Sequence, residues 1–315
     1  MRLFDSIIRK NIKEEEGNMN FQNLYNELSA INAGEMAVQI SLYTDENGDF
    51  AVIPAGFTVS DKKDEKTINK GLVVYGPDAS EFVWIPTYVT ELKARDFGCY
   101  MYGDRSLRGY QDDTGSKLYQ EMKASTEEFG GFYIGRYESS YGSGSSIDDY
   151  VPASKRVTAD EPGRIWVHFG PQKAEKACRN LYADNDTVQG FFLWGANWDT
   201  ALQWLIDSGN KTFSDIAYDS TEWGNYSDSS FARNGNEQYT GRWEEAKANN
   251  IYDLAGNNWE WTQERHHGSY VMRGGGRTIM FGPAYGSYYP AAVRDPLPGN
   301  DDHPNVAFRI GLFVK

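Results

Sequence analysis

The chain has 315 residues, of which 24% are charged, and carries a formal net charge of −14 with 9 Trp and 21 Tyr. This acidic balance excludes a nucleic-acid binder, because affinity for phosphate backbones comes largely from Lys and Arg. No run of about 20 apolar residues is present, so we expect a globular chain without a membrane span.

The N-terminal segment, residues 1–49, is expected to form a helical arm followed by a first strand. Apolar residues recur at helical spacing in two stretches, and a glycine follows each one. These apolar residues are Leu3, Phe4, Ile7, Ile8, Ile12, Phe21, Leu24, Tyr25, Leu28 and Ile31. The helices either pack on their own domain or serve in attachment or oligomerisation, and the sequence leaves both readings open. Charges at positions 5, 9 and 10 interrupt the early apolar stretch, so no secretory signal is expected.

From residue 36 onward the pattern changes to period two and to β-forming residues. It predicts strands at residues 37–43, 50–53, 56–59, 72–75, 82–85 and 131–137. It predicts two helices, at residues 173–181 and 199–206. Loops rich in Gly, Asn, Asp and Ser fill most of the last third. The predicted fold class is α+β, with few helices, short strands and long loops.

Several short motifs follow one another in a recognisable order. They are GFYIGRYE at 131–138, FFLWGANWDTALQWL at 191–205, NIYDLAGNNWEW at 250–261, MRGG at 272–275 and AFR at 307–309. Together they resemble the formylglycine-generating-enzyme, or sulfatase-modifying-factor, branch of the C-type-lectin fold, whose pattern is GNVWEW, then RGG, then GFR. The resemblance implies a C-type-lectin-like domain over residues 50–315, which leaves the N-terminal helices outside it.

The motifs also have a physical interpretation of their own. Trp259 and Trp261 lie two residues apart, so they share one face of a predicted strand, where they are expected to bury large apolar areas. Glu260 is expected to point the other way, toward the loop side. Arg273 precedes two glycines and suits a buried guanidinium, with Glu260 as its candidate carboxylate partner. Asn258 and Ala307 depart from the family pattern, and both departures are mild.

Two enzymatic relatives test whether this chain is a catalyst. Formylglycine-generating enzymes hold copper with two cysteine thiolates shortly after RGG, but residues 276–295 contain no cysteine, and Cys99 and Cys178 lie far upstream. Iron-dependent sulfoxide synthases need three histidines, mostly from an added helical domain that this chain lacks. We therefore expect no enzyme and no catalytic residues, and a divergent oxidase is the alternative.

Members of the resembled family often carry structural calcium. Asp and Asn oxygens, which hard cations prefer, are abundant at residues 184–186 and 300–302. Neither stretch has the spacing of a defined calcium loop, so structural calcium is left open, the metal site is unknown and no other cofactor is expected.

The C-terminal segment has an unusual composition. Residues 274–314 contain no Lys, Glu, Gln or Trp, although they are rich in Gly, Pro, Tyr and Ser. Random substitution at the adenines of Asn codons yields Tyr, Ser, Asp, Gly and many other residues but never these four. Diversity-generating retroelements vary their target proteins in this way, commonly at the C-terminus of this branch of the C-type-lectin fold. The segment 276–305 resembles such a variable region, although Met280 would need another codon.

Adaptable recognition surfaces use Tyr, Ser, Gly and Asn, with aromatic residues and Arg as anchors. The expected ligand-binding residues are Arg277, Thr278, Ile279, Phe281, Tyr285, Ser287, Tyr288, Tyr289, Asp295, Leu297, Asn300, Asp301, His303 and Asn305. The alternative for some aromatic residues, especially Phe281 and one of Tyr288 and Tyr289, is that they are buried anchors of the loop.

These observations favour a non-catalytic ligand-binding protein that is diversified by a retroelement and has a receptor-binding or adhesion role in a phage tail or a bacterium. The expected partner is a protein or a cell-surface receptor, oligomers are left open, and the expected location is a virion or the cytoplasm before assembly. The alternatives are the divergent oxidase and a fixed structural virion or surface module, which would carry the same C-terminal residues in every genome.

Overall fold

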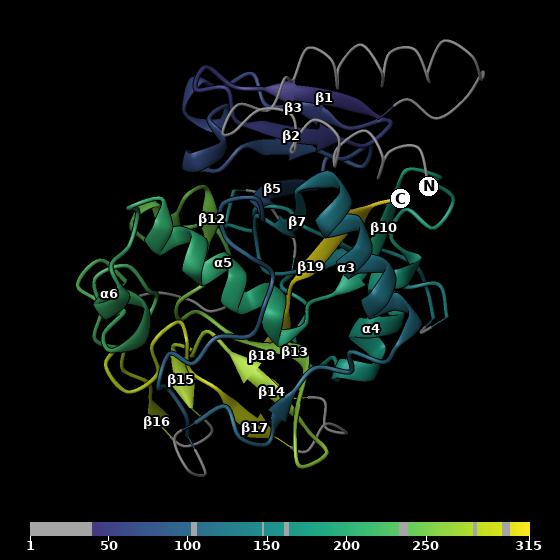
Figure 1. Ribbon diagram of the computed structural model, residues 1–315. Helices are drawn as coiled ribbons and strands as arrows, with labels where there is room; N and C mark the ends of the chain where they lie inside the picture. The colour runs from purple at the N-terminus through teal and green to yellow at the C-terminus, as the bar shows by residue number, and fades with distance from the viewer. Residues whose placement is uncertain are drawn as a thin grey trace, which may run out of the picture.

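Short strands and a few helices make up the computed structural model, which describes residues 40–101, 106–146, 148–160, 164–232, 239–279, 282–297 and 303–315 (Figure 1). The strands are β1 (Ser41–Thr44), β2 (Phe50–Ile53), β3 (Thr58–Val59), β4 (Val73–Tyr75), β5 (Glu81–Pro86), β6 (Tyr110–Gln111), β7 (Gly131–Gly135), β8 (Ser140–Ser143), β9 (Val151–Ala153), β10 (Val188–Phe192), β11 (Lys247–Ala248), β12 (Ile251–Tyr252), β13 (Trp259–His266), β14 (Ser269–Arg273), β15 (Thr278–Ile279), β16 (Gly282–Pro283), β17 (Asp295–Leu297), β18 (Val306–Phe308) and β19 (Ile310–Val314). The α-helices are α3 (Lys117–Phe129), α4 (Pro171–Asn180), α5 (Gly195–Asp207) and α6 (Phe213–Ala217). The predicted α+β fold class is confirmed.

A six-stranded antiparallel sheet forms the centre of the fold, in the order β10-β19-β7-β5-β4-β3. The last strand of the chain, β19, lies between β10 and β7, so the C-terminus is held inside the sheet. Every residue of β19 and of β7 is buried, which is what a strand covered on both faces requires. This sheet fixes the end of the chain.

The second sheet carries the site. Its order is β17-β14-β13-β18, with β6 paired to the far end of β13. Strands β13, β14 and β17 are antiparallel neighbours, whereas β13 and β18 run parallel. In Figure 1 this sheet lies at the bottom of the view, and the separate pair of strands β1 and β2 lies at the top.

One arginine connects the two sheets. Arg309, between β18 and β19, donates from Nε and Nη2 to both oxygens of Glu260 in β13, at 3.0 and 2.5 Å. It also donates to the carbonyl oxygen of Gly135 in β7, at 3.0 Å. Both charged side chains are almost fully buried, so each needs the other to offset the loss of its hydration. The expectation that Glu260 points to the loop side and pairs with Arg273 is therefore wrong, whereas the burial of Trp259 and Trp261 is confirmed.

Most predicted elements occur close to their expected positions. Strand β2 has the predicted bounds, and α4 and α5 contain nearly all of the residues predicted as helical. Helix α3 was not predicted, although Ser116 accepts a hydrogen bond at its N-terminus and Gly130 ends it with a φ of 76°. The N-terminal arm lies outside the described residues. In the described ranges, no helix is long and apolar enough to cross a bilayer.

Candidate ligand-binding site

The segment with the unusual composition leaves the second sheet as a long loop and returns to it. Strands β14 and β17 pair with each other, and Met272 lies opposite Asp295. Residues 274–294 therefore start and finish at neighbouring points, with the short hairpin β15–β16 between them. Figure 1 shows this hairpin at the edge of the molecule, close to α6.

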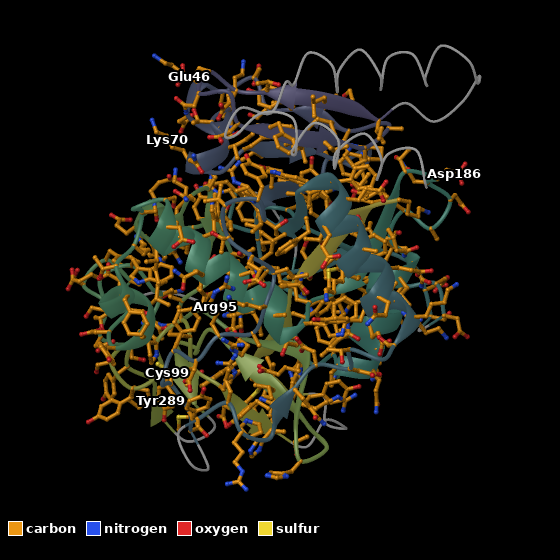
Figure 2. All side chains as sticks on the ribbon, in the orientation of Figure 1. Glu46, Lys70, Arg95, Cys99, Asp186 and Tyr289 are labelled. Atoms are coloured by element: carbon orange, nitrogen blue, oxygen red, sulfur yellow. The ribbon has the colours of Figure 1, made fainter. Side chains whose placement is uncertain are left out.

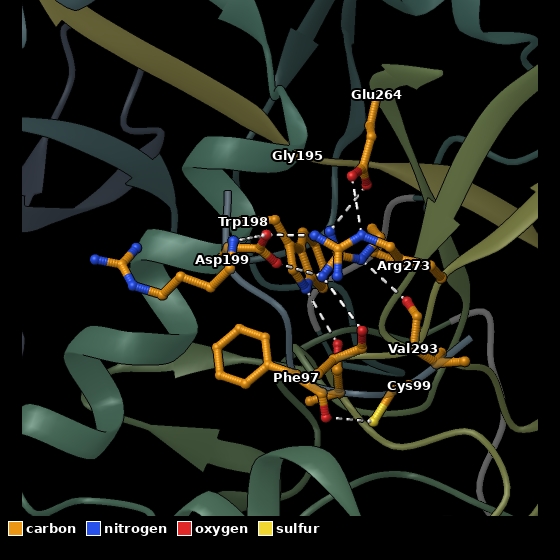
Figure 3. Close-up of polar contacts among 12 residues, drawn as sticks. Phe97, Cys99, Gly195, Trp198, Asp199, Glu264, Arg273 and Val293 are labelled. Atoms are coloured by element: carbon orange, nitrogen blue, oxygen red, sulfur yellow. Dashed lines mark hydrogen bonds and ion pairs between the residues drawn. The ribbon is translucent and has the colours of Figure 1, made fainter. Parts of the chain in front are cut away.

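Two arginines occupy the two ends of this loop, and the same two carboxylates bind both. Arg273 donates to Asp199 in α5 at 2.6 Å and to Glu264 in β13 at 3.1 Å. Arg294 donates to Glu264 at 2.9 Å and also to Asp199. Figure 3 labels Arg273 with its partners Asp199 and Glu264. All four side chains are at most 2% exposed. We call these four residues the arginine clamp.

The charges of the arginine clamp balance, two against two. Burial alone would raise the pKa of Asp199, but the guanidinium groups of Arg273 and Arg294 hold it below its ordinary value. Removing one partner from such a buried set costs about 3–5 kcal/mol, because a desolvated charge is left uncompensated. The base of the loop is thus closed by residues that cannot be exchanged singly.

Side chains from outside the loop also hold its backbone. The hydroxyl of Tyr226 lies 3.0 Å from the carbonyl oxygen of Gly274 and 2.7 Å from that of Tyr289. The indole nitrogen of Trp198 in α5 donates to the carbonyl oxygen of Ala291 at 3.1 Å. These bonds use backbone atoms of the loop, so they do not depend on which side chains the loop carries.

The segment 218–229 supports the loop along its outer part. Ser227 Oγ donates to the carbonyl oxygen of Arg277 at 2.6 Å, and the carbonyl oxygen of Gly286 accepts from the backbone N–H of Ser220 at 3.2 Å. The N–H of Gly286 donates to Asp228 at 3.2 Å. The loop is therefore supported along its length, and its conformation is set by its neighbours.

The tip of the loop presents two tyrosines and a serine. Tyr285 is 40% exposed and Tyr288 is 71% exposed, with ring centroids 6.2 Å apart, and Ser287 between them is exposed. The backbone N–H groups of Tyr288 and Tyr289 both donate to the carbonyl oxygen of Tyr285, at 3.1 and 3.0 Å, which closes the turn. A tyrosine offers a large amphipathic contact at a low cost in rotamer entropy. These three predicted residues lie together and are accessible.

Other predicted residues contact the rest of the protein and hold the loop in place. The Arg277 guanidinium donates to Asn225 Oδ1 at 3.1 Å and to the carbonyl oxygen of Tyr226 at 3.0 Å. Tyr289 packs edge-on against Trp259, with centroids 5.6 Å apart. Tyr289 is thus the partly buried anchor of the pair named in the sequence, and Tyr288 is the exposed member. Leu297 also packs partly buried against the core.

The remaining predicted residues lie nearer the second sheet. Asn305 donates to Thr278 Oγ1 at 3.0 Å, which joins the β15–β16 hairpin to the segment before β18. Burial raises the pKa of Asp295, in β17, to about 6. His303 is half-buried, and its carbonyl oxygen accepts from the N–H of His168 at 3.0 Å. Ile279 lies in β15, whereas Phe281, Asn300 and Asp301 lie outside the described residues.

Sequence reasoning missed the residues that hold the loop. Asp199 lies 74 residues before Arg273, and Glu264 lies nine residues before it on the paired strand. No sequence motif joins either carboxylate to Arg273 and Arg294. Tyr226 was missed for the same reason. The one available signal was an arginine followed by two glycines. Gly274 and Gly275 do adopt positive φ angles of 84° and 68°, which turns the chain away from β14.

In the described ranges, no group of three His, Cys, Asp or Glu residues is arranged to hold a metal ion. The amide of Asn185, in one of the two candidate calcium stretches, donates to the carbonyl oxygen of Ala55 at 3.0 Å and accepts from the N–H of Thr187 at 2.8 Å. The other stretch, residues 300–302, lies outside the described residues.

The fold resembles two solved structures. PvdO from Pseudomonas aeruginosa is 14% identical, with a TM-score of 0.43, over 76% of this chain and 97% of that one. Treponema denticola variable protein 1 is 11% identical, with a TM-score of 0.30, over 86% of this chain and 98% of that one. No protein-family model matches the sequence, and no curated protein matches it. The likeness is one of fold, and no ligand or activity follows from it.

The close fit of the loop at Gly286 gives a first prediction. A Cβ atom there would lie 2.5 Å from the backbone nitrogen of Thr221, so Gly286→Ala must displace the tip. We expect the free energy of unfolding to fall by about 1–3 kcal/mol in urea titrations. Gly115→Ala is the matched control, because the nearest atom lies at 3.6 Å and the change should stay within about 0.5 kcal/mol. Equal losses in the two variants would contradict the close fit.

Proposed function

We propose that this protein is a non-catalytic ligand-binding protein, that a retroelement diversifies residues 276–305, and that the tip of the loop contacts a receptor on a cell surface. The observation that supports this proposal most directly is that the residues that hold the loop differ from the residues that face solvent. Buried side chains from outside hold its backbone, while Tyr285, Ser287 and Tyr288 face solvent. Such a loop can change its exposed residues and keep its shape.

The composition of the segment supports the same proposal. The absence of Lys, Glu, Gln and Trp from residues 274–314 agrees with adenine-directed substitution in Asn codons. Tyr and Ser, which that mechanism supplies, occupy all three exposed positions of the tip. Both residues suit adaptable protein recognition. A receptor-binding or adhesion role, in a phage tail or on a bacterium, would use a surface of this kind.

The two thiols support a role without catalysis. Burial raises the pKa of the Cys99 thiol to about 11 and that of the Cys178 thiol well above its ordinary value. Both side chains are buried, in contacts with the hydrophobic core. A protonated, inaccessible thiol is a poor copper ligand and a poor nucleophile, so the oxidase alternative receives no support from these residues.

Sequencing the gene across its source population tests diversification. We expect differences at Tyr285, Ser287 and Tyr288, in codons that end in C or T, beside a near-copy template and a reverse transcriptase gene. The buried positions Gly286 and Arg294 should stay constant, because their side chains or lack of one shape the loop. A uniform segment without a nearby template would contradict the proposal and favour a fixed structural module.

Thiol labelling tests the absence of oxidase chemistry. Because its pKa is about 11, the Cys99 thiol is thiolate in on the order of one molecule in a thousand at pH 8. We expect iodoacetamide to label Cys99 and Cys178 at least about a hundredfold more slowly in the native chain than in urea. An exposed thiol introduced by Ser287→Cys should label rapidly in the same sample. Fast native labelling of Cys99 or Cys178, or stoichiometric copper that protects them, would revive the oxidase.

A further inference from the structure

A second exposed aromatic pair lies beside the tip of the loop. Phe213, the first residue of α6, is 43% exposed, and Tyr218, directly after α6, is 64% exposed. Their rings meet edge to face, with centroids 5.7 Å apart, and Phe213 is supported from below by buried Phe97 at 5.9 Å. We call Phe213 and Tyr218 the α6 shelf. Neither residue belongs to the segment that lacks Lys, Glu, Gln and Trp.

Hydrogen bonds join the α6 shelf to the loop. The N–H of Ser220, two residues after Tyr218, donates to the carbonyl oxygen of Gly286 in the tip, at 3.2 Å. Ser220 Oγ donates to the carbonyl oxygen of Asp215 within α6, at 2.6 Å. On the inner side, the N–H of Ala292 donates to the carbonyl oxygen of Ile216, at 3.1 Å. The shelf and the tip are therefore two parts of one surface.

The two segments that form this joint surface carry charge of one sign. Residues 212–232 contain four acidic residues, Asp215, Asp219, Glu222 and Asp228, and no Lys or Arg, while residues 282–293 contain no charged residue. Asp219, Glu222 and Asp228 are exposed around the two aromatic pairs.

Two basic residues next to this surface have partners within the protein. Lys211 Nζ lies over the ring of Trp223, 5.0 Å from its centroid, and Arg277 donates into the scaffold. The surface is thus aromatic and acidic.

We propose that the α6 shelf and the tip together bind a protein segment rich in Lys and Arg. Aromatic faces attract ammonium and guanidinium groups, and the surrounding carboxylates add charge complementarity. A second copy of this chain is a poor occupant, because it would bring an equally acidic surface to the same place. This inference rests on the proposed function and adds that half of the surface, the α6 shelf, is constant while the tip varies.

The constant α6 shelf and the variable tip would contribute differently to recognition. The shelf attracts cationic segments, and this attraction is common to all variants. Tyr285, Ser287 and Tyr288 determine which of these segments binds best. Charge attraction raises the association rate and weakens with salt, so affinity common to all variants falls as ionic strength rises.

Peptide binding to the immobilised full chain tests the partner class. The probes are three synthetic peptide pools of equal length and equal aromatic content, with variable positions filled by Lys and Arg, by Gln and Ser, or by Asp and Glu. We expect the cationic pool to bind about tenfold more tightly than the neutral pool and to lose that advantage at high salt.

Two sets of substitutions locate the binding. The triple variant Asp219→Asn, Glu222→Gln, Asp228→Asn keeps an oxygen acceptor at each position and should weaken binding of the cationic pool about tenfold. The matched control removes three exposed charges on distant faces. It combines Glu46→Gln, Asp184→Asn and Asp186→Asn and should change binding less than about twofold (Figure 2 labels Glu46 and Asp186). The shelf variant Phe213→Ser, Tyr218→Ser should weaken binding as the acidic triple does.

Several results would overturn the inference. Equal losses in the two triple variants would mean attraction by net charge alone, and equal binding of the neutral pool would exclude a cationic partner. Self-association in sedimentation runs that the shelf variant abolishes would identify a second copy as the occupant. If Tyr285→Ser, Tyr288→Ser loses binding while the shelf variant keeps it, the proposed function stands and the joint surface does not.

Discussion

Two buried carboxylates determine where the loop at residues 274–294 begins and ends. Asp199 and Glu264 each bind both Arg273 and Arg294, so the two ends of residues 274–293 cannot separate without leaving charges unpaired in the interior. Through Asp199 the loop is tied to α5, and through Glu264 to β13, which joins β18 and the central sheet. The loop thus takes its position from the most buried part of the fold and needs few side chains of its own.

Residues outside the loop also hold the rest of it in place. Tyr226, Trp198 and Ser227 contact backbone carbonyl groups in the loop, so they hold any sequence that can follow the same path. Positions with packed neighbours, such as Gly286, restrict that path, whereas the side chains of Tyr285, Ser287 and Tyr288 contact solvent. A loop usually gains adaptability by losing order. Here the support from outside allows the loop to be adaptable and ordered at once.

The sequence indicated the fold class and a candidate site, because both leave local patterns. Alternating apolar residues predicted β2 with its observed bounds, and motif order indicated a C-type-lectin-like domain. Helix α3 was missed although its N-terminal serine and C-terminal glycine were visible. The assignment of Glu260 to Arg273 failed because Glu260 binds Arg309 instead. Arg273 binds Glu264, nine residues away on the paired strand, and Asp199, which becomes its neighbour only when α5 packs on β13. Likewise, composition could not separate exposed Tyr288 from anchored Tyr289, since that difference depends on packing against Trp259.

The central claim is that the loop keeps its shape whatever its tip carries. The most direct measurement is the protease resistance of two displayed libraries of the full chain, one randomised at Tyr285, Ser287 and Tyr288 and the other at Ala284, Gly286 and Ala292. Our account predicts that most members of the first library stay within about 0.5 kcal/mol of the parent, as surface changes do, while most of the second unfold. If both libraries lose stability alike, the tip is part of the scaffold and the account is wrong.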